Sequence, residues 1–214
     1  MTFSLLAMDK KRRFMVAASA TKTLSVGASV IALRPRVGGV LSQALTNSEL
    51  RGLGLDNLSK GSSPTDAISE TLSKDNDMET RQLAIMDIAG NSATHTGVDC
   101  LAHAADSAEN GYAIIGNLLS DPNVVTSMAG GFQDVEGAQN LAKMALQMMR
   151  AGELAGGDSR GLQSAALIVR DMTLGNEYSA AEVDIRVDDH TDPLAELDRI
   201  LKLALQEKAV KVVN

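Results

Sequence analysis

The chain of 214 residues has no tryptophan, one cysteine and only four prolines, and these scarcities exclude several classes of protein. Because Cys100 has no second cysteine to pair with, a disulfide scaffold is excluded and a reducing compartment is expected. Two tyrosines and three phenylalanines offer few platforms on which nucleic-acid bases could stack. The net charge of −7 argues against the basic face that phosphate binding needs, so we expect no nucleic-acid partner.

Long apolar runs are also missing. No segment approaches the roughly 18–20 apolar residues of a membrane span, so we expect no membrane partner. Segment 10–20, four basic residues followed by a short apolar stretch, imitates a secretory signal. That stretch is at the minimum length for export, however, and another apolar segment precedes the charges. We therefore favour two strands joined by a basic turn, in a cytoplasmic protein.

What the chain does have is ample aliphatic material, with 44% hydrophobic and 22% charged residues. This composition is typical of globular proteins. At roughly 100–200 residues per domain, we expect a single domain over residues 1–214.

Short apolar runs typical of strands occur in two groups, separated by segments with helical spacing. The expected strands are 2–8, 14–20, 26–33, 37–45, 81–88, 92–96, 112–115, 162–170 and 182–187. The expected helices are 48–59, 64–73, 121–132, 135–151 and a last one that starts at 192–193. Because strict strand–helix alternation is absent, we predict an α+β fold. The expected architecture is a four-layer αββα sandwich of two mainly antiparallel sheets with outer helices.

The common catalytic and cofactor motifs are absent, and no cofactor is expected. The candidate that remains is Thr2. If Met1 is removed, Thr2 carries both a hydroxyl nucleophile and a free α-amine. An α-amine with a pKa of about 8 is able to accept the hydroxyl proton near neutral pH. The alternative is that Thr2 merely begins a strand.

Two further sets of polar residues lie at strand ends. Asn117 follows a short buried strand, where its amide could donate to an oxyanion or could simply cap a turn. Gln163 and Ser164 open strand 162–170, and because adjacent strand residues point to opposite faces, only one of them faces a given cleft. Thr46 and Asn47 end the fourth strand, where they line the same cleft or cap the next helix.

Charged and metal-ligating residues offer other possibilities. Asp158 and Arg160 could clamp an anionic substrate group or pair with each other in a tight turn. Two groups of residues have side chains that commonly bind metal ions. The first is Asp188, Asp189 and His190 with Asp192, and the second is His95, Cys100 and His103. For the first group we favour a charged loop and for Cys100 an inert buried thiol, so no metal is expected.

Several blocks of sequence resemble one family. They are residues 2–7, 16–19, 42–47, 94–97 with Cys100, 116–119, 155–165 and 184–193. They occur in order over nearly the whole chain and resemble a bacterial and archaeal family known as domain of unknown function 1028. That family is grouped with the N-terminal-nucleophile (Ntn) hydrolases. The resemblance implies their sandwich fold but no particular substrate.

The resemblance also bears on the candidate site. In proteasome-like relatives, an acidic residue on the second strand and a later lysine support the nucleophile. Here the second strand offers Ala18 and Ser19, Lys22 lies just beyond it, and the later stretch offers Arg34 and Arg36. Because that supporting set is not reproduced, a small amide or related acyl compound is a better substrate class than a peptide.

We therefore predict an Ntn-type amidohydrolase with Thr2 as nucleophile and Asn117 as oxyanion donor. Ser19, Gln43, Gln163 and Ser164 are expected to shape the pocket. The expected partner is a small-molecule substrate, and relatives of this fold commonly self-associate, so a homo-oligomer is expected. The competing hypothesis is a catalytically inactive binding protein on the same scaffold.

Overall fold

The N-terminal hairpin forms the centre of a six-stranded antiparallel sheet. A computed structural model describes residues 2–176 and 178–213, and β1 (Thr2–Met8) pairs with β2 (Phe14–Thr21) along its whole length. The charged turn between them is closed by buried Asp9, whose carboxylate accepts the backbone N–H groups of Arg13 and Phe14. The other strands are β8 (Tyr112–Asn117) and β7 (Ala105–Glu109) beyond β1, and β9 (Ser164–Asp171) and β10 (Val183–Val187) beyond β2.

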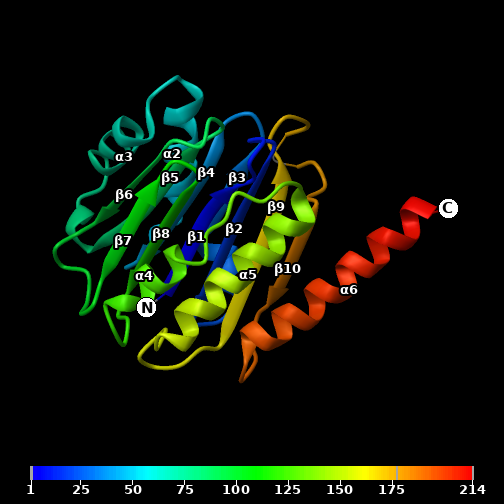
Figure 1. Ribbon diagram of the computed structural model, residues 1–214. Helices are drawn as coiled ribbons and strands as arrows, with labels where there is room; N and C mark the ends of the chain where they lie inside the picture. The colour runs from blue at the N-terminus through cyan, green and yellow to red at the C-terminus, as the bar shows by residue number, and fades with distance from the viewer. Residues whose placement is uncertain (1, 177, 214) are drawn as a thin grey trace.

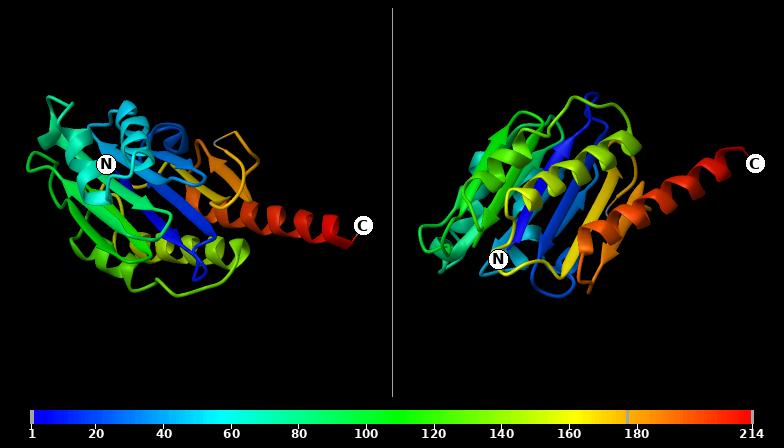
Figure 2. Two further views of the ribbon diagram at one scale, coloured as in Figure 1. Left: turned by 90° about the horizontal axis from the view of Figure 1, so that it is seen from above. Right: turned by 60° about the horizontal axis from the view of Figure 1, so that its bottom comes forward.

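A second, four-stranded antiparallel sheet packs against the first. Its strands, in spatial order, are β3 (Ile31–Arg34), β4 (Gly38–Ala44), β5 (Arg81–Asp87) and β6 (Ser92–Thr96). The interface between the sheets is an apolar cluster to which Leu6 and Met15 contribute from one sheet and Leu41 and Met86 from the other. Figures 1 and 2 show the two sheets lying face to face. The α+β class and the two antiparallel sheets are thus as predicted.

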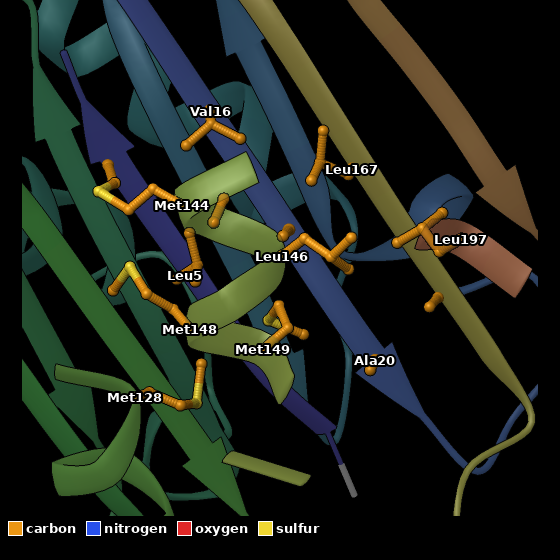
Figure 3. Packing of buried hydrophobic residues seen from close by; sticks show 14 of the residues in the cluster. Leu5, Val16, Ala20, Met128, Met144, Leu146, Met148, Met149, Leu167 and Leu197 are labelled. Carbon is orange, nitrogen blue, oxygen red and sulfur yellow. The ribbon is translucent and has the colours of Figure 1, made fainter. Parts of the chain in front are cut away.

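Helices pack on the outer face of each sheet. On the larger sheet lie α4 (Asn123–Ala129), α5 (Ala138–Leu154) and the first half of α6 (Pro193–Val213), and the methionines of α5 pack over β1 and β2 (Figure 3). On the smaller sheet lie α2 (Glu49–Ser59) and α3 (Pro64–Leu72). The rest of α6 extends away from both sheets (Figures 1 and 2). No helix in the described part of the chain combines the length and apolarity needed to cross a bilayer.

The period of two along β1 decides which side chains meet the second sheet. Phe3 and Leu5 belong to the core under the helices, whereas Leu6 and Met8 belong to the core between the sheets. Because Thr2 is an even-numbered position on this strand, its side chain shares the inter-sheet face. All seven residues of β1 are buried, so the segment 2–8 is held inside the fold.

The predicted strands differ from the structure in three places. The predicted strand 26–33 is a short helix, α1 (Val26–Ser29), followed by β3, and a Cβ at Gly27 would lie 2.6 Å from the Ala166 side chain. This close approach to β9 leaves no room for a larger side chain. Strand β7 was not predicted, because Ala-Asp-Ser-Ala-Glu has no β-branched or aromatic residue. The predicted strand 162–170 begins only at Ser164, so Gln163 lies just before it.

Helix limits and the 3₁₀ turn account for the other differences. The predicted helix 121–132 is limited to α4, and the predicted helix 135–151 begins after Gly137, whose φ is +83°. A 3₁₀ turn, η1 (Met78–Thr80), precedes β5. Helix α3 begins as predicted, with the Ser63 hydroxyl accepting the backbone N–H of Asp66.

Replacing each of two glycines in the second sheet and its helices by alanine should change the free energy of unfolding in opposite directions. A Cβ at Gly38, where φ is +151°, would lie 2.2 Å from the Met86 carbonyl oxygen. We expect Gly38→Ala to lower the free energy of unfolding by about 2 kcal/mol or more. Gly52 lies within α2 and has nothing near its Cβ position, so Gly52→Ala should raise it by about 0.5–1 kcal/mol. Urea denaturation measures both, and a loss of equal size in the two variants would contradict the packing described.

Candidate active site

At one end the interface between the sheets changes from apolar to polar. Ser4 lies opposite Ser19 in the β1–β2 ladder, and their hydroxyl oxygens are 2.7 Å apart. The Ser4 hydroxyl also donates to Gln43 Oε1 of the facing sheet at 2.6 Å. All three side chains are fully buried, and buried polar groups of this kind are costly unless they are paired. These bonds therefore fix one sheet against the other.

Gln82, on β5, is the centre of this polar layer. Its Oε1 accepts hydrogen bonds from Gln43 Nε2 at 2.8 Å and from Asn117 Nδ2 at 3.0 Å. Its Nε2 donates to the Thr96 hydroxyl at 2.9 Å and to the Gly116 carbonyl at 2.8 Å. One buried amide thus ties β4, β6 and β8 together. Because an amide nitrogen has two N–H donors, the bond to Gln82 occupies only one of those on Asn117.

Thr2 lies beside this layer, at the start of β1. It is opposite Thr21 on one side and Asn117 on the other, and it is 7% exposed. Its hydroxyl donates to the Thr21 hydroxyl at 3.2 Å, and its carbonyl accepts from Gln43 Nε2 at 3.1 Å. Directly opposite residues in an antiparallel pair have Cβ atoms about 4.5–5.5 Å apart, so the Thr2 and Asn117 side chains are near neighbours.

A cavity of about 310 Å³ opens next to Asn117, at the same end of both sheets. It is lined by Ala44, Leu45, Thr80, Asp99, Cys100, Leu101, Asn117 and Leu118. Ala44 and Leu118 have φ values of +76° and +50°, a left-handed backbone that costs a non-glycine residue about 1–3 kcal/mol. They lie where β4 and β8 end, and the backbone turns there to form the cavity wall.

A buried ion pair holds the loop after β4, where Leu45 lines the cavity. Arg81 Nε and a terminal nitrogen bind the two carboxylate oxygens of Asp75, both at 3.1 Å, and the guanidinium also donates to the Leu45 carbonyl at 2.6 Å. Burial by itself raises the pKa of Asp75, but hydrogen bonds from Arg81, Asn47 and the Asp77 N–H outweigh it. The pKa of Asp75 is therefore below its ordinary value.

Four of the residues singled out from the sequence come together in this region, namely Thr2, Ser19, Gln43 and Asn117. Thr46 and Asn47 lie in the loop after β4, close to Leu45. Thr46 is exposed, and Asn47 donates to Asp75 and accepts the N–H of Glu49 at the start of α2. Asn47 thus contacts the first residue of α2, whose N-cap position is Ser48.

The remaining polar candidates lie on the β9 side of Thr21. Ser164 is buried, and its hydroxyl donates to the Thr23 carbonyl and accepts the N–H of Val26. Gln163 lies just before β9, and its Nε2 donates to Asp189, so it contacts other residues than Ser164 does. These contacts hold the segment that follows β2.

Asp158 and Arg160 form the pair that the sequence also allowed. The buried Asp158 carboxylate binds the Arg160 guanidinium at 3.2 Å and accepts the backbone N–H groups of Arg160 and Lys22. This carboxylate therefore joins the loop after β2 to the loop before β9. Arg34 ends β3 and Arg36 lies in the β3–β4 turn, both at the opposite end of β4 from Gln43.

The metal alternatives are not supported. Within residues 2–176 and 178–213, no group of three or more histidine, cysteine, aspartate and glutamate side chains is arranged to hold a metal ion. His190 Nδ1 accepts the backbone N–H of Asp192, and His95 Nε2 contacts the Met78 carbonyl. Burial raises the pKa of the Cys100 thiol, with a further contribution from Asp99 and Glu79, so the thiol is not activated as a nucleophile.

The sequence interpretation missed the residues that organise the site, which are Gln82, Ser4 and Thr21. A signal existed for Gln82, because a glutamine inside the apolar run 81–88 must find a partner if the strand is buried. The pairing itself depends on how β5 faces β1 and β8, which only the fold reveals.

The class of protein follows from this geometry: an α+β protein with two packed antiparallel sheets and a polar cluster where β1 begins. The profile described as "Family of unknown function (DUF1028)" matches residues 2–197, and the chain belongs to this family. The crystal structure of protein SPO2555 from Silicibacter pomeroyi, of the same family, matches with a TM-score of 0.83 and 30% identity. That alignment covers 95% of this chain and 88% of SPO2555.

More distant solved structures were also found. The Anbu (Gly-1) mutant from Hyphomicrobium sp. strain MC1 gives a TM-score of 0.47 at 13% identity, covering 99% of this chain and 97% of that one. Anbu (ancestral beta-subunit) from Yersinia bercovieri gives 0.44 at 12% identity, covering 100% and 96%. Both are too distant to support an argument about function. A search of curated proteins finds no match to the chain.

Removing the Gln82 amide should destabilise the fold strongly. Gln82→Met keeps the approximate volume but leaves the Gln43 and Asn117 N–H groups and the Gly116 carbonyl without this partner. At about 1–3 kcal/mol for each buried group left unpaired, we expect a loss of about 3 kcal/mol or more in the free energy of unfolding. The matched control is Gln147→Met on the exposed face of α5, which should change it by less than about 0.5 kcal/mol. Equal effects in urea denaturation would contradict the role of Gln82.

From the Asp75–Arg81 pair we predict that the protein loses part of its free energy of unfolding in acid. Because the pKa of Asp75 is lower in the folded than in the unfolded chain, its contribution is present above the unfolded value of about 3.9. That contribution is lost as the pH falls through the lower folded value. We expect Asp75→Asn to cost about 3 kcal/mol at pH 7 and to depend less on pH below about 4 than the wild type does.

The control for this experiment is Asp56→Asn. Asp56 pairs with Arg34 on the surface, with its side chain 53% exposed, so the cost should be at most about 1 kcal/mol. Parallel acid dependences for the wild type and Asp75→Asn, measured by urea denaturation across the pH range, would show that the buried pair does not contribute as described.

Proposed function

We propose that the chain is an Ntn-type amidohydrolase in which Thr2, after removal of Met1, is the nucleophile. The observation that carries the proposal is the place of Thr2: buried at the start of a central strand, beside the Asn117 amide and at the end of the sheets where a cavity opens. A chain terminus that only trailed into solvent would need none of these contacts.

The hydrogen-bond partners of Thr2 favour its own amine as the base. Its hydroxyl contacts the Thr21 hydroxyl and its carbonyl contacts the Gln43 amide, both of which are uncharged. In the proposed reaction the α-amine accepts the hydroxyl proton, directly or through water, as the oxygen attacks the substrate carbonyl. The amine then returns the proton to the leaving nitrogen as the C–N bond breaks. Water hydrolyses the resulting Thr2 ester, which releases the acid and restores the hydroxyl.

Asn117 is the proposed oxyanion donor. Its Nδ2 gives one N–H to Gln82, which holds the amide in place, and the second N–H is then directed by that same bond. A donor fixed before the reaction needs no reorganisation when negative charge develops, and one such donor is worth about 3–4 kcal/mol. In this proposal Gln82 positions Asn117, and Gln43 positions the Thr2 carbonyl.

The arrangement of layers also supports the proposal. Helices α2 and α3 pack on one sheet, and α4, α5 and α6 pack on the other. We infer that this is the four-layer αββα sandwich expected from the resemblance to Ntn hydrolases. The roles of Ser19, Thr46, Asn47, Asp158, Arg160, Gln163 and Ser164 in substrate binding stay predictions. A cytoplasmic location, which the single cysteine favours, also stays a prediction. The same holds for self-association.

The test is a hydrolysis screen over small amides and esters, with wild type and Thr2→Ala compared. We expect activity in the wild type, a loss of at least about 10³-fold in Thr2→Ala, and partial retention in Thr2→Ser, which keeps a hydroxyl. The matched control is Thr71→Ala, which removes a buried hydroxyl from the α2–α3 layer and should leave activity unchanged.

Equal turnover by wild type and Thr2→Ala would remove Thr2 from the mechanism. Absence of turnover in every protein, together with tight binding of one of the compounds, would favour the alternative of a binding protein on this scaffold. Calorimetry on the same compounds distinguishes these results.

A further inference from the structure

The cavity next to Asn117 has a composition that restricts what it can bind. Its apolar wall comes from Ala44, Leu45, Leu101 and Leu118. Leu45 and Leu101 are 62% and 63% exposed, although leucine is ordinarily buried. Apolar side chains exposed around a cavity are typical of ligand sites, where the ligand covers them.

The charge at the cavity is of one sign. Among the described residues that line it, Asp99 is the charged one, and it is acidic. Glu79 lies next to it and accepts the backbone N–H of Val98. The nearby cation, Arg81, is occupied by the carboxylates of Asp75 and Asp77 and by the Leu45 carbonyl, and its side chain is only 8% exposed. An anionic ligand would therefore meet a negative field with no free cation of the lining to oppose it.

We propose that this cavity binds the acyl part of the substrate, and that this part is an aliphatic chain which is neutral or carries a positive charge at its far end. The inference rests on the proposed function, because it takes the carbonyl carbon to lie between Thr2 and Asn117. From there the chain extends along Leu118 and Leu101 toward Asp99. The cavity volume of about 310 Å³ accommodates an acyl chain of several carbons.

The Asp158–Arg160 loop is a neighbour of this cavity, because Asp158 forms a β-bridge with Leu119 and the Ser159 N–H donates to the carbonyl of Leu118, which lines the cavity. That loop contains the cation for which an anionic substrate group was considered, but its guanidinium binds the Asp158 carboxylate. Among the described residues that line the cavity itself, Asp99 still supplies the charge.

Binding to the Thr2→Ala protein tests the inference without requiring turnover. The probes are hexanamide, 6-aminohexanamide and adipic acid monoamide, which share chain length and differ in the charge at the far end, with acetamide and butanamide as shorter neutral probes. Chemical-shift perturbation in NMR titrations gives the affinity. We expect 6-aminohexanamide to bind about tenfold more tightly than adipic acid monoamide. Affinity should rise by up to about fourfold for each added CH₂.

Variants of the lining residues test whether the probes bind in this cavity. Asp99→Asn should reduce the preference for the cationic probe severalfold and leave hexanamide binding unchanged, whereas Leu101→Ser should weaken hexanamide. The matched charge control is Glu109→Gln, at the far end of β7 from the cavity, which should change nothing. The inference is overturned if the anionic probe binds as well as the cationic one, if chain length has no effect, or if no probe binds.

The same data separate this inference from the proposed function. If Thr2→Ala binds the probes with the expected order of affinities but the wild type hydrolyses none of the amides, the cavity assignment is supported and the hydrolase proposal is contradicted. Hydrolysis that depends on Thr2 but prefers anionic acyl groups would support the hydrolase and contradict the cavity assignment.

Discussion

The structure depends on a small set of hydrogen bonds that replace apolar packing where the two sheets meet at the start of β1. Gln82 and Gln43 reach from the four-stranded sheet to Asn117, Ser4 and the Thr2 carbonyl on the six-stranded sheet. Elsewhere the same interface is filled by leucine, methionine and alanine. Apolar contacts tolerate small shifts between sheets, whereas buried amides need defined partners at defined distances. The polar end therefore sets the register of one sheet on the other, and it does so beside the first residues of the chain.

That constraint explains why the cavity lies where it does. Strands β4 and β8 end in left-handed residues, Ala44 and Leu118, and the Asp75–Arg81 pair holds the loop after β4 through the Leu45 carbonyl. The cavity lies between the polar layer, through Asn117, and the loop after β4, through Leu45. A strained backbone conformation persists only where the surrounding structure imposes it, and residues in such conformations are common at functional sites. In the proposed function, this arrangement brings Thr2, Asn117 and the cavity to the same end of the sheets.

Much of the fold could be predicted from the sequence, and the reasons for the misses are physical. The hairpin 2–8 with 14–20, the helix at Pro64 and the two antiparallel sheets follow from apolar runs, caps and the absence of strict alternation. Segment 26–33 has strand composition, yet its first half is helical, with Gly27 packed closely against Ala166 of β9. Thr2 and Asn117 could be named as candidate site residues from their chemistry alone. Their adjacency and the role of Gln82 could not be predicted, because they depend on strand order and on the facing sheet.

The central claim is that Thr2 supplies both the nucleophile and the base, and this requires a free α-amine on that residue. The most direct measurement is mass spectrometry of the N-terminal peptide from protein purified from its native cells. The account predicts a peptide that begins at Thr2 with an unmodified amine. A peptide that retains Met1 in the native protein, or one whose Thr2 amine is acetylated, would contradict it, because no base of the proposed kind would then exist.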